Sequence, residues 1–272
     1  MSERPTDQTD PSPRAGSSAP DSSAAHHVLD QADGGEPRRL LSLSDEQLAG
    51  LDGHQQPQFT AMPWLDQRPD QAAVAADVGL RSLIADGRVS AARDGATGRL
   101  RWVAGTELRG CQLLRRTAAR FATAERTVQS ESGPLVSRAY YYVHETGVLE
   151  EEVTPSGIHH FTPLRVEQVP ARIATLIDPN SVAGQGGAPV TVRRTELASG
   201  HPLAARLADT RAQSVLTTVH ADDDSVQQVS VYVTGSEVLT MEALDPAAED
   251  PPLEFRPVDA GDLVALAAAV VS

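Results

Sequence analysis

An internal repeat of roughly 80 residues is the feature that most constrains the fold of this chain. Each copy carries the same landmarks in the same order, and the matched pairs are Thr106-Glu107-Leu108 with Thr195-Glu196-Leu197, Tyr142 with Tyr232, Val148-Leu149 with Val238-Leu239, and Phe161-Thr162-Pro163 with Phe255-Arg256-Pro257. Within these pairs the separation grows only from 89 to 94 residues. Two similar units in tandem commonly pair about a pseudo-twofold axis, so we expect one joint body.

The order of elements in each copy predicts the α+β fold class. A short strand is followed by a leucine-rich helix, then by four sequential strands and a final apolar helix. Polar clusters such as Thr234-Gly235-Ser236 separate the strands and are typical of turns between antiparallel neighbours. Parallel strands would need crossover connections of about a dozen residues, for which the spacing leaves no room. We therefore expect a duplicated antiparallel-sheet-plus-helices unit with pseudo-twofold symmetry.

Composition divides the chain into five segments. Residues 1–39 are rich in Ser, Pro, Asp and Gly, and they predict a disordered tail. Residues 40–97 predict a helical segment, because Ser44 and Gln47 have the spacing of a capping box and apolar residues at helical spacing follow Pro69. The remaining boundaries place the first repeat at residues 98–177, a linker at 178–188 and the second repeat at 189–272.

Alternation along the strands assigns the two faces of the predicted sheet. One face carries an apolar set in each copy, and the two sets are Ala139, Tyr141 and Val143, and Val229, Val231 and Val233. We expect that face to be core. The opposite face carries Tyr140, Tyr142 and Tyr232, and since tyrosine is enriched in interfaces we expect these three to contribute to a partner-binding surface. The alternative is that helices cover this face too.

The charge balance bears on the class of partner. The chain has 23 arginines, no lysine and 37 acidic residues, which gives a net charge of −14 at pH 7. Repulsion from phosphate makes nucleic acid and anionic membrane surfaces unfavourable partners. The single cysteine, Cys111, leaves no intramolecular disulfide, and the sequence shows neither a signal region nor an apolar run of about 20 residues. We expect a cytoplasmic protein that does not enter a membrane.

No pattern of side chains predicts a catalytic centre, a metal or a cofactor. Adjacent strands would bring together one set of possible metal ligands, which is His144, Glu150, Glu152 and His160. Their spacing is not diagnostic, and solvated polar side chains are the simpler interpretation. His159 aligns with Leu253 of the second copy and is expected to point into the core. Cys111 has no base at readable spacing, so we expect it to be buried.

Two further segments lack the features of the sites that they superficially suggest. Asp222-Asp223-Asp224 has neither the glycine nor the distant glutamate of a calcium loop, and it predicts a solvated turn. Gly184-Gln185-Gly186-Gly187 precedes no Lys-Ser or Lys-Thr pair and opens no helix, so it predicts a linker. We expect a protein that is not an enzyme; an enzyme whose site the sequence hides is a further alternative.

Residues 73–103 allow a second interpretation, as a winged helix that binds DNA. A helix ending at Gly87 would be followed by a strand near Val89, a turn at Asp94-Gly95 and a strand at residues 99–103. The wing would be lined by four arginines, which are Arg88, Arg93, Arg99 and Arg101. The net charge of −14 and the assignment of Leu100-Arg101-Trp102 to the repeat argue against this transcriptional regulator.

Three stretches of the sequence carry a family resemblance. They are the alanine-rich helix at 72–85, the run from Tyr140 to Leu149, and Phe161-Thr162-Pro163-Leu164 with the helix that follows at 169–177. Over residues 42–271 the chain resembles the EspG-type ESX secretion-associated proteins, cytosolic chaperones of type VII secretion. The resemblance implies a quasi-twofold duplicated fold and a non-enzymatic role. It also implies binding of a secreted helical-hairpin protein, of the PE–PPE or WXG type, that is kept soluble and guided to the export machinery.

Overall fold

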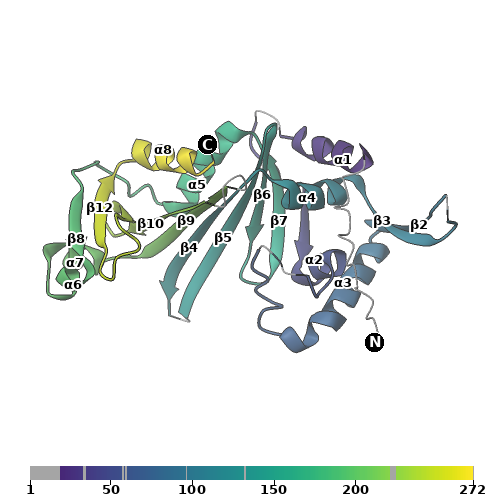
Figure 1. Ribbon diagram of the computed structural model, residues 1–272, viewed down its shortest axis with the longest axis horizontal. Helices are drawn as coiled ribbons and strands as arrows, with labels where there is room; N and C mark the ends of the chain where they lie inside the picture. The colour runs from purple at the N-terminus through teal and green to yellow at the C-terminus, as the bar shows by residue number, and fades with distance from the viewer. Residues whose placement is uncertain are drawn as a thin grey trace, which may run out of the picture.

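Ten strands in the described part of the chain form one long antiparallel sheet, with helices on both of its faces (Figure 1). The computed structural model describes residues 19–32, 35–56, 58, 60–95, 97–131, 133–220 and 225–271. The expected turn at Asp222-Asp223-Asp224 lies outside the described residues. The large antiparallel sheet with its helices confirms the predicted α+β class.

The strands of the large sheet have the spatial order β1-β7-β6-β5-β4-β9-β10-β11-β12-β8. Its first half consists of β1 (Leu41–Ser44), β4 (Arg120–Ser130), β5 (Gly133–His144), β6 (Gly147–Val153) and β7 (Ile158–Leu164). Its second half consists of β8 (Val190–Arg193), β9 (Ala212–His220), β10 (Val226–Val233), β11 (Val238–Ala243) and β12 (Pro252–Val258). A separate hairpin is formed by β2 (Val89–Arg93) and β3 (Leu100–Ala104).

The helices divide between the two faces of the sheet. One face is covered by α5 (Val169–Ile177), preceded by the 3₁₀ turn η2 (Val166–Gln168), and by α8 (Ala260–Val271). On the opposite face, the first half is covered by α1 (Ala19–Leu29), α2 (Asp45–Asp52), α3 (Ala72–Ala85), which follows the 3₁₀ turn η1 (Pro69–Gln71), and α4 (Thr106–Thr117). The second half is covered there by α6 (Arg194–Ala198) and α7 (Pro202–Leu207). No helix among the described residues has both the length and the apolar character needed to cross a membrane.

The strand registers of the two halves match residue by residue. Tyr142 pairs with Leu149, which pairs in turn with Pro163. Their counterparts Tyr232, Leu239 and Pro257 are joined in the same way. The apolar face is also the one predicted, because Tyr141 and Val231 lie with α5 and α8 in one buried cluster.

The pseudo-twofold axis passes through the junction of β4 and β9, where Ala124 pairs with Leu216. Phe121 pairs with Tyr142, and Gln213 pairs with Tyr232, so β4 and β9 are equivalent strands with an offset of 92 residues. Ala124 and Leu216 are themselves 92 residues apart and are both buried. The symmetric centre of the sheet is thus a buried apolar pair, which joins the two halves into one core.

The leading strand of the first unit is not the one that the repeat predicted. Residues Leu100-Arg101-Trp102, expected to match Val190-Thr191-Val192, belong to β3 and pair with β2 outside the large sheet. The edge position that β8 takes beside β12 is occupied at the other end by β1, which pairs with β7. Residues 45–105 therefore form an insertion between β1 and α4. The other segment boundaries stay predictions.

The N-terminal region also differs from the expected disordered tail over residues 1–39. Residues 19–29 form α1, in which Ala24, Val28 and Leu29 are buried. α1 packs on α4 at Gly110, where an added Cβ would lie 2.3 Å from the carbonyl oxygen of Ala24. Burial against another element supplies the stability that composition alone does not indicate, since short helices gain most of theirs from packing.

The inserted helices form as the sequence predicts and pack unusually closely. The Ser44 hydroxyl accepts a hydrogen bond from the Gln47 backbone N–H, and the Gln47 side chain accepts one from the Ser44 N–H, which confirms the capping box. Gly87 has a φ of +70° and follows the end of α3. Where α2 and α3 cross, a Cβ at Gly79 would lie 2.1 Å from the carbonyl oxygen of Glu46. Only glycine allows this approach of the two backbones.

Candidate partner-binding surface

Two of the three tyrosines expected on a partner-binding surface are buried. Tyr140 and Tyr142 lie in the cluster formed with α1 to α4, where Tyr140 stacks on Phe121 at 5.9 Å between ring centroids and the Tyr142 ring meets Phe121 tilted, at 5.3 Å. The Tyr140 hydroxyl oxygen accepts a hydrogen bond of 2.9 Å from the Ala61 N–H. The expectation that this part of the face meets solvent is wrong, because the insertion between β1 and α4 supplies helices that cover it.

A polar network, also buried, surrounds Tyr142. Its hydroxyl donates to Glu151 at 2.7 Å, and the Nε of Arg115 on α4 lies 2.9 Å from the same carboxylate oxygen. Arg115 also pairs with Asp52 at the end of α2, at 3.1 Å. Burial alone would raise the pKa of Glu151, but Arg115 and His159 outweigh it and hold that pKa at about 2. The network therefore joins β5, β6, α2 and α4 through charge-assisted contacts.

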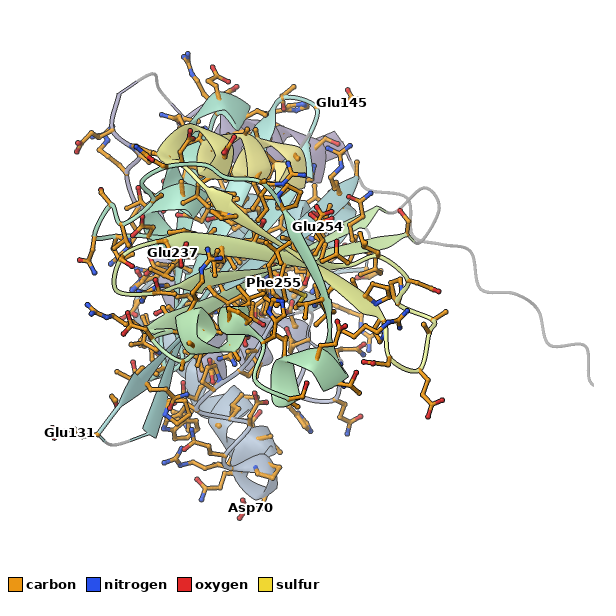
Figure 2. All side chains as sticks on the ribbon, turned by 90° about the vertical axis from the view of Figure 1, so that its left-hand side faces the viewer. Asp70, Glu131, Glu145, Glu237, Glu254 and Phe255 are labelled. Carbon is orange, nitrogen blue, oxygen red and sulfur yellow. The ribbon has the colours of Figure 1, made fainter. Side chains whose placement is uncertain are left out.

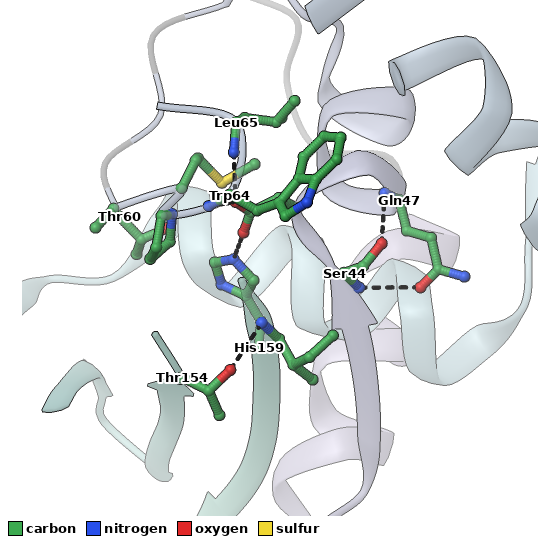
Figure 3. Close-up of polar contacts among 12 residues, drawn as sticks. Ser44, Gln47, Thr60, Trp64, Leu65, Thr154 and His159 are labelled. Atoms are coloured by element: carbon green, nitrogen blue, oxygen red, sulfur yellow. Dashed lines mark hydrogen bonds and ion pairs between the residues drawn. The ribbon is translucent and has the colours of Figure 1, made fainter. Parts of the chain in front are cut away.

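His159 extends this network to the start of α2, as Figure 3 shows. Its Nδ1 lies 2.6 Å from Glu151 and its Nε2 lies 2.8 Å from Asp45. Asp45 also accepts hydrogen bonds from the backbone N–H groups of Trp64 and Leu65. Although burial favours neutral imidazole, the two carboxylates raise the pKa of His159. The prediction that His159 points into the core is confirmed, and the three side chains hold the loop before α3 against the sheet.

The second half of this face is covered by α6 and α7 around Phe255, and Figure 2 looks onto this end of the molecule. Tyr232 packs against Phe255 with ring centroids 6.1 Å apart, and its hydroxyl accepts a long contact of 3.5 Å from Gln213. Tyr232 is only half-buried. It is therefore the one member of the predicted set with surface left for a partner, and its role in binding stays a prediction.

Between the two covered ends, the middle of the face is polar and only partly buried. It is formed by β4, β9 and the ends of β5 and β10, with Thr123, Glu125, Thr217 and Gln228 side by side in the registers. Arg138 donates to Glu125 at 2.6 Å, and Gln228 donates to Thr217 at 3.3 Å. This stretch is a solvated antiparallel face of the common kind.

The largest exposed apolar side chains of the insertion lie elsewhere, on the β2–β3 hairpin and α3. Leu100 is 68% exposed and Trp102 is 58% exposed on β3, and α3 exposes Val74 and Val78 one turn apart. Figure 1 shows the hairpin projecting from the body beside α3. The repeat predicts a sheet strand at Leu100-Arg101-Trp102 and so does not indicate this exposure, although a tryptophan directly after Arg99-Leu100-Arg101 is a usable signal for an exposed contact residue.

The possible metal ligands are spread over separate contacts. Glu150 is held by Arg172 of α5, His160 shares a hydrogen bond of 2.8 Å with the Ser42 hydroxyl, and His144 contacts the Leu114 carbonyl oxygen at 3.1 Å. Within the described ranges, no group of three or more His, Cys, Asp or Glu residues is placed to hold a metal ion. Cys111 is buried as expected, and desolvation raises the pKa of its thiol.

A solved structure has a similar fold over most of its length. It is the Mycobacterium tuberculosis type VII secretion system chaperone EspG5, in complex with the PE25–PPE41 dimer. The TM-score is 0.54, with 12% sequence identity, and the match covers 85% of this chain and 95% of that chain. No protein-family model matches the sequence, and no curated protein does. At this identity the likeness establishes the fold, and it agrees with the duplicated architecture expected from the repeat.

Proposed function

We propose that this chain is a chaperone or adaptor that binds a secreted helical-hairpin protein of the PE–PPE kind in the cytoplasm. The observation that carries the proposal is the shared fold, which covers 95% of a chaperone solved with a PE–PPE dimer. Function does not follow from fold alone, so the proposal also needs a surface on this chain that suits such a partner.

The β2–β3 hairpin and α3 supply that surface. Leu100 and Trp102 expose large apolar side chains on a projecting element, and Val74 and Val78 do so on the neighbouring helix. Contiguous or clustered apolar exposure is costly in a monomer and marks sites of protein contact. Tryptophan is among the residues that most often dominate binding energy. A helical hairpin with an apolar tip has the chemistry to cover these side chains.

The buried polar network argues for a structural rather than catalytic use of the ionisable residues. Asp45, Glu151 and His159 are fully buried and satisfy one another by hydrogen bonds. A substrate would reach them only if the loop before α3 moved away. This supports the non-enzymatic interpretation, in which the network fixes the insertion that carries the binding surface.

Co-expression with candidate partners tests the proposal. The chain is expressed with each PE–PPE and WXG-type pair encoded in its source genome, and complexes are isolated by affinity and size-exclusion chromatography. We expect a stable complex with a PE–PPE pair. Trp102→Ser should weaken it by about 2 kcal/mol or more. Leu135→Ser is the control, because Leu135 is also a large exposed apolar side chain, at 51%, but lies on β5. Failure of every pair to co-purify would refute the proposal.

DNA binding by residues 73–103 is the second candidate, and one observation favours it. The hairpin follows α3 directly, and Arg88, Arg93, Arg99 and Arg101 all lie on or beside it. Against this, the exposed residues of α3 include Val74, Asp77 and Val78 with a single arginine, Arg81, whereas a recognition helix needs a basic and polar face. A specific mobility shift with promoter DNA at physiological salt would move the assignment to this role.

A further inference from the structure

A pocket of about 450 Å³ lies at the base of the β2–β3 hairpin, between α2, α3 and α4. Its apolar wall includes Leu51, Leu80 and Trp102, and its polar lining includes Arg101, Arg109 and Gln112. The pocket thus combines apolar surface with two guanidinium groups, and it adjoins the exposed side chain of Trp102.

Neither arginine of this pocket is neutralised by the described part of the chain. Arg101 and Arg109 have no ion pair there, and the buried Nε of Arg109 has no hydrogen-bond partner. The nearby carboxylate, Asp52, is already engaged by Arg115 and Arg116 and by the Gln112 amide. No carboxylate of the described residues is therefore left to pair with Arg101 or Arg109 at this pocket.

We propose that this pocket binds a carboxylate of the protein partner, in the form of an acidic side chain beside an apolar one. The proposal rests on the proposed chaperone function. Guanidinium groups hold carboxylates through paired, charge-assisted hydrogen bonds, and the guanidinium groups of Arg101 and Arg109 both line the pocket. The apolar neighbour would pack on Leu51, Leu80 and Trp102.

The pocket can be tested without the partner, using Trp102 as the reporter. Trp64 and Trp102 are the two tryptophans of the protein, so a Trp64→Phe background isolates the Trp102 fluorescence. The probe is sodium phenylacetate, with phenylacetamide as its neutral match at equal ionic strength. We expect a saturable change with phenylacetate, and at least tenfold weaker binding of it in Arg109→Gln. Equal responses to both probes, or equally effective competition by inorganic phosphate, would overturn the assignment.

The second arm uses the PE–PPE pair that co-purifies with the chain. Arg109→Gln should raise the Kd of that complex at least tenfold at low salt and should flatten its dependence on salt concentration. Arg256→Gln is the control, since it removes the same charge from an exposed residue of β12. If Arg109→Gln binds the pair with the wild-type Kd, the assignment of the pocket is wrong but the chaperone function stands. Absence of any complex counts against the function, and the phenylacetate titration still decides the pocket.

Discussion

His159 and Glu151 lie 2.6 Å apart, Nδ1 to Oε1, at a point where neither side chain reaches solvent. The other ring nitrogen of His159 lies 2.8 Å from Asp45. Neutral imidazole carries a single N–H and can donate to one carboxylate only, whereas imidazolium donates to two ionised carboxylates at once. The two carboxylates therefore favour the charged form of His159, which joins β7 to β6 and to the first residue of α2.

The stability of the protein should therefore fall as pH rises past neutrality, in a way that depends on His159. Its folded-state pKa is raised above the usual 6.5, so its contribution is complete below that value and is lost as pH rises through the folded pKa. The measurement is the free energy of urea unfolding between pH 5 and 9. We expect the advantage of wild type over His159→Gln to shrink as pH rises.

His160 provides the control for that experiment, because it is the neighbouring histidine with the opposite shift. Partial desolvation and Arg39 lower its pKa, so any contribution of His160 grows as pH rises. His160→Gln should leave the alkaline loss of stability in place. A pH dependence that survives in His159→Gln would show that another group causes it.

The tyrosine face offers a second prediction, which separates folding from binding. Tyr142→Phe removes the hydroxyl that donates to buried Glu151, and it should lower the free energy of unfolding by about 1–3 kcal/mol. Tyr232→Phe removes only a half-buried hydroxyl with one long contact, and it should change stability by less than about 0.5 kcal/mol. Chemical denaturation of both variants gives these values.

The affinity of the Tyr142 and Tyr232 variants for a partner tests whether these tyrosines contribute to a binding surface. Folded Tyr142→Phe should bind a captured PE–PPE pair as wild type does, because its ring has no exposed surface. Tyr232→Ser is the informative variant, since Tyr232 retains surface. Unchanged affinity in Tyr232→Ser would remove the last of the three from the binding surface.

Much of the sheet was predictable from the sequence, because the repeat and the strand alternation report on the same faces. Apolar residues at every second position predict that Tyr141 and Val231 lie in the core, and the structure places both there. The fold class followed from short turns between sequential strands. These signals are local or periodic, so one sequence is enough to detect them.

The covering of the opposite face was not predictable in the same way, because it depends on contacts between distant residues. Arg115 meets Glu151 across 36 positions, and His159 meets Asp45 across 114. In sequence, Glu150-Glu151-Glu152 has the character of a solvated run. No local pattern distinguishes a solvated carboxylate from one that an arginine on a distant helix neutralises, as Arg115 of α4 does for Glu151.

α1 gives a third prediction, which concerns how the N-terminal helix is held. An added Cβ at Gly110 would approach the Ala24 carbonyl oxygen to 2.3 Å and the Val28 side chain to 2.5 Å. Gly110→Ala should therefore destabilise the protein, although alanine favours a helix over glycine by about 1 kcal/mol. Thermal unfolding and protease cleavage within residues 19–32 measure the effect.

Gly105→Ala is the matched control for that change, because its Cβ would meet only the Arg88 carbonyl oxygen, at an ordinary 3.5 Å. We expect that variant to keep the wild-type melting temperature within a few degrees. Equal stability of Gly110→Ala and wild type would indicate that α1 does not pack on α4 in solution.

The assignment of the buried face of the sheet is tested most directly at Val231. This residue of β10 is 0% exposed and lies among α5, α8 and the central strands, whereas Val226 of the same strand is 62% exposed. Val231→Asp places an unpaired carboxylate in that core, at a cost of several kcal/mol against a typical total stability of about 5–15 kcal/mol. We expect it to unfold the protein or to yield an insoluble product.

Val226→Asp makes the same chemical change on the same strand in solvent, so it should remain folded with a nearly unchanged melting temperature. Because both variants carry the same Val→Asp change in one strand, comparable stability of the two would place Val231 outside the core and reverse the faces of the sheet.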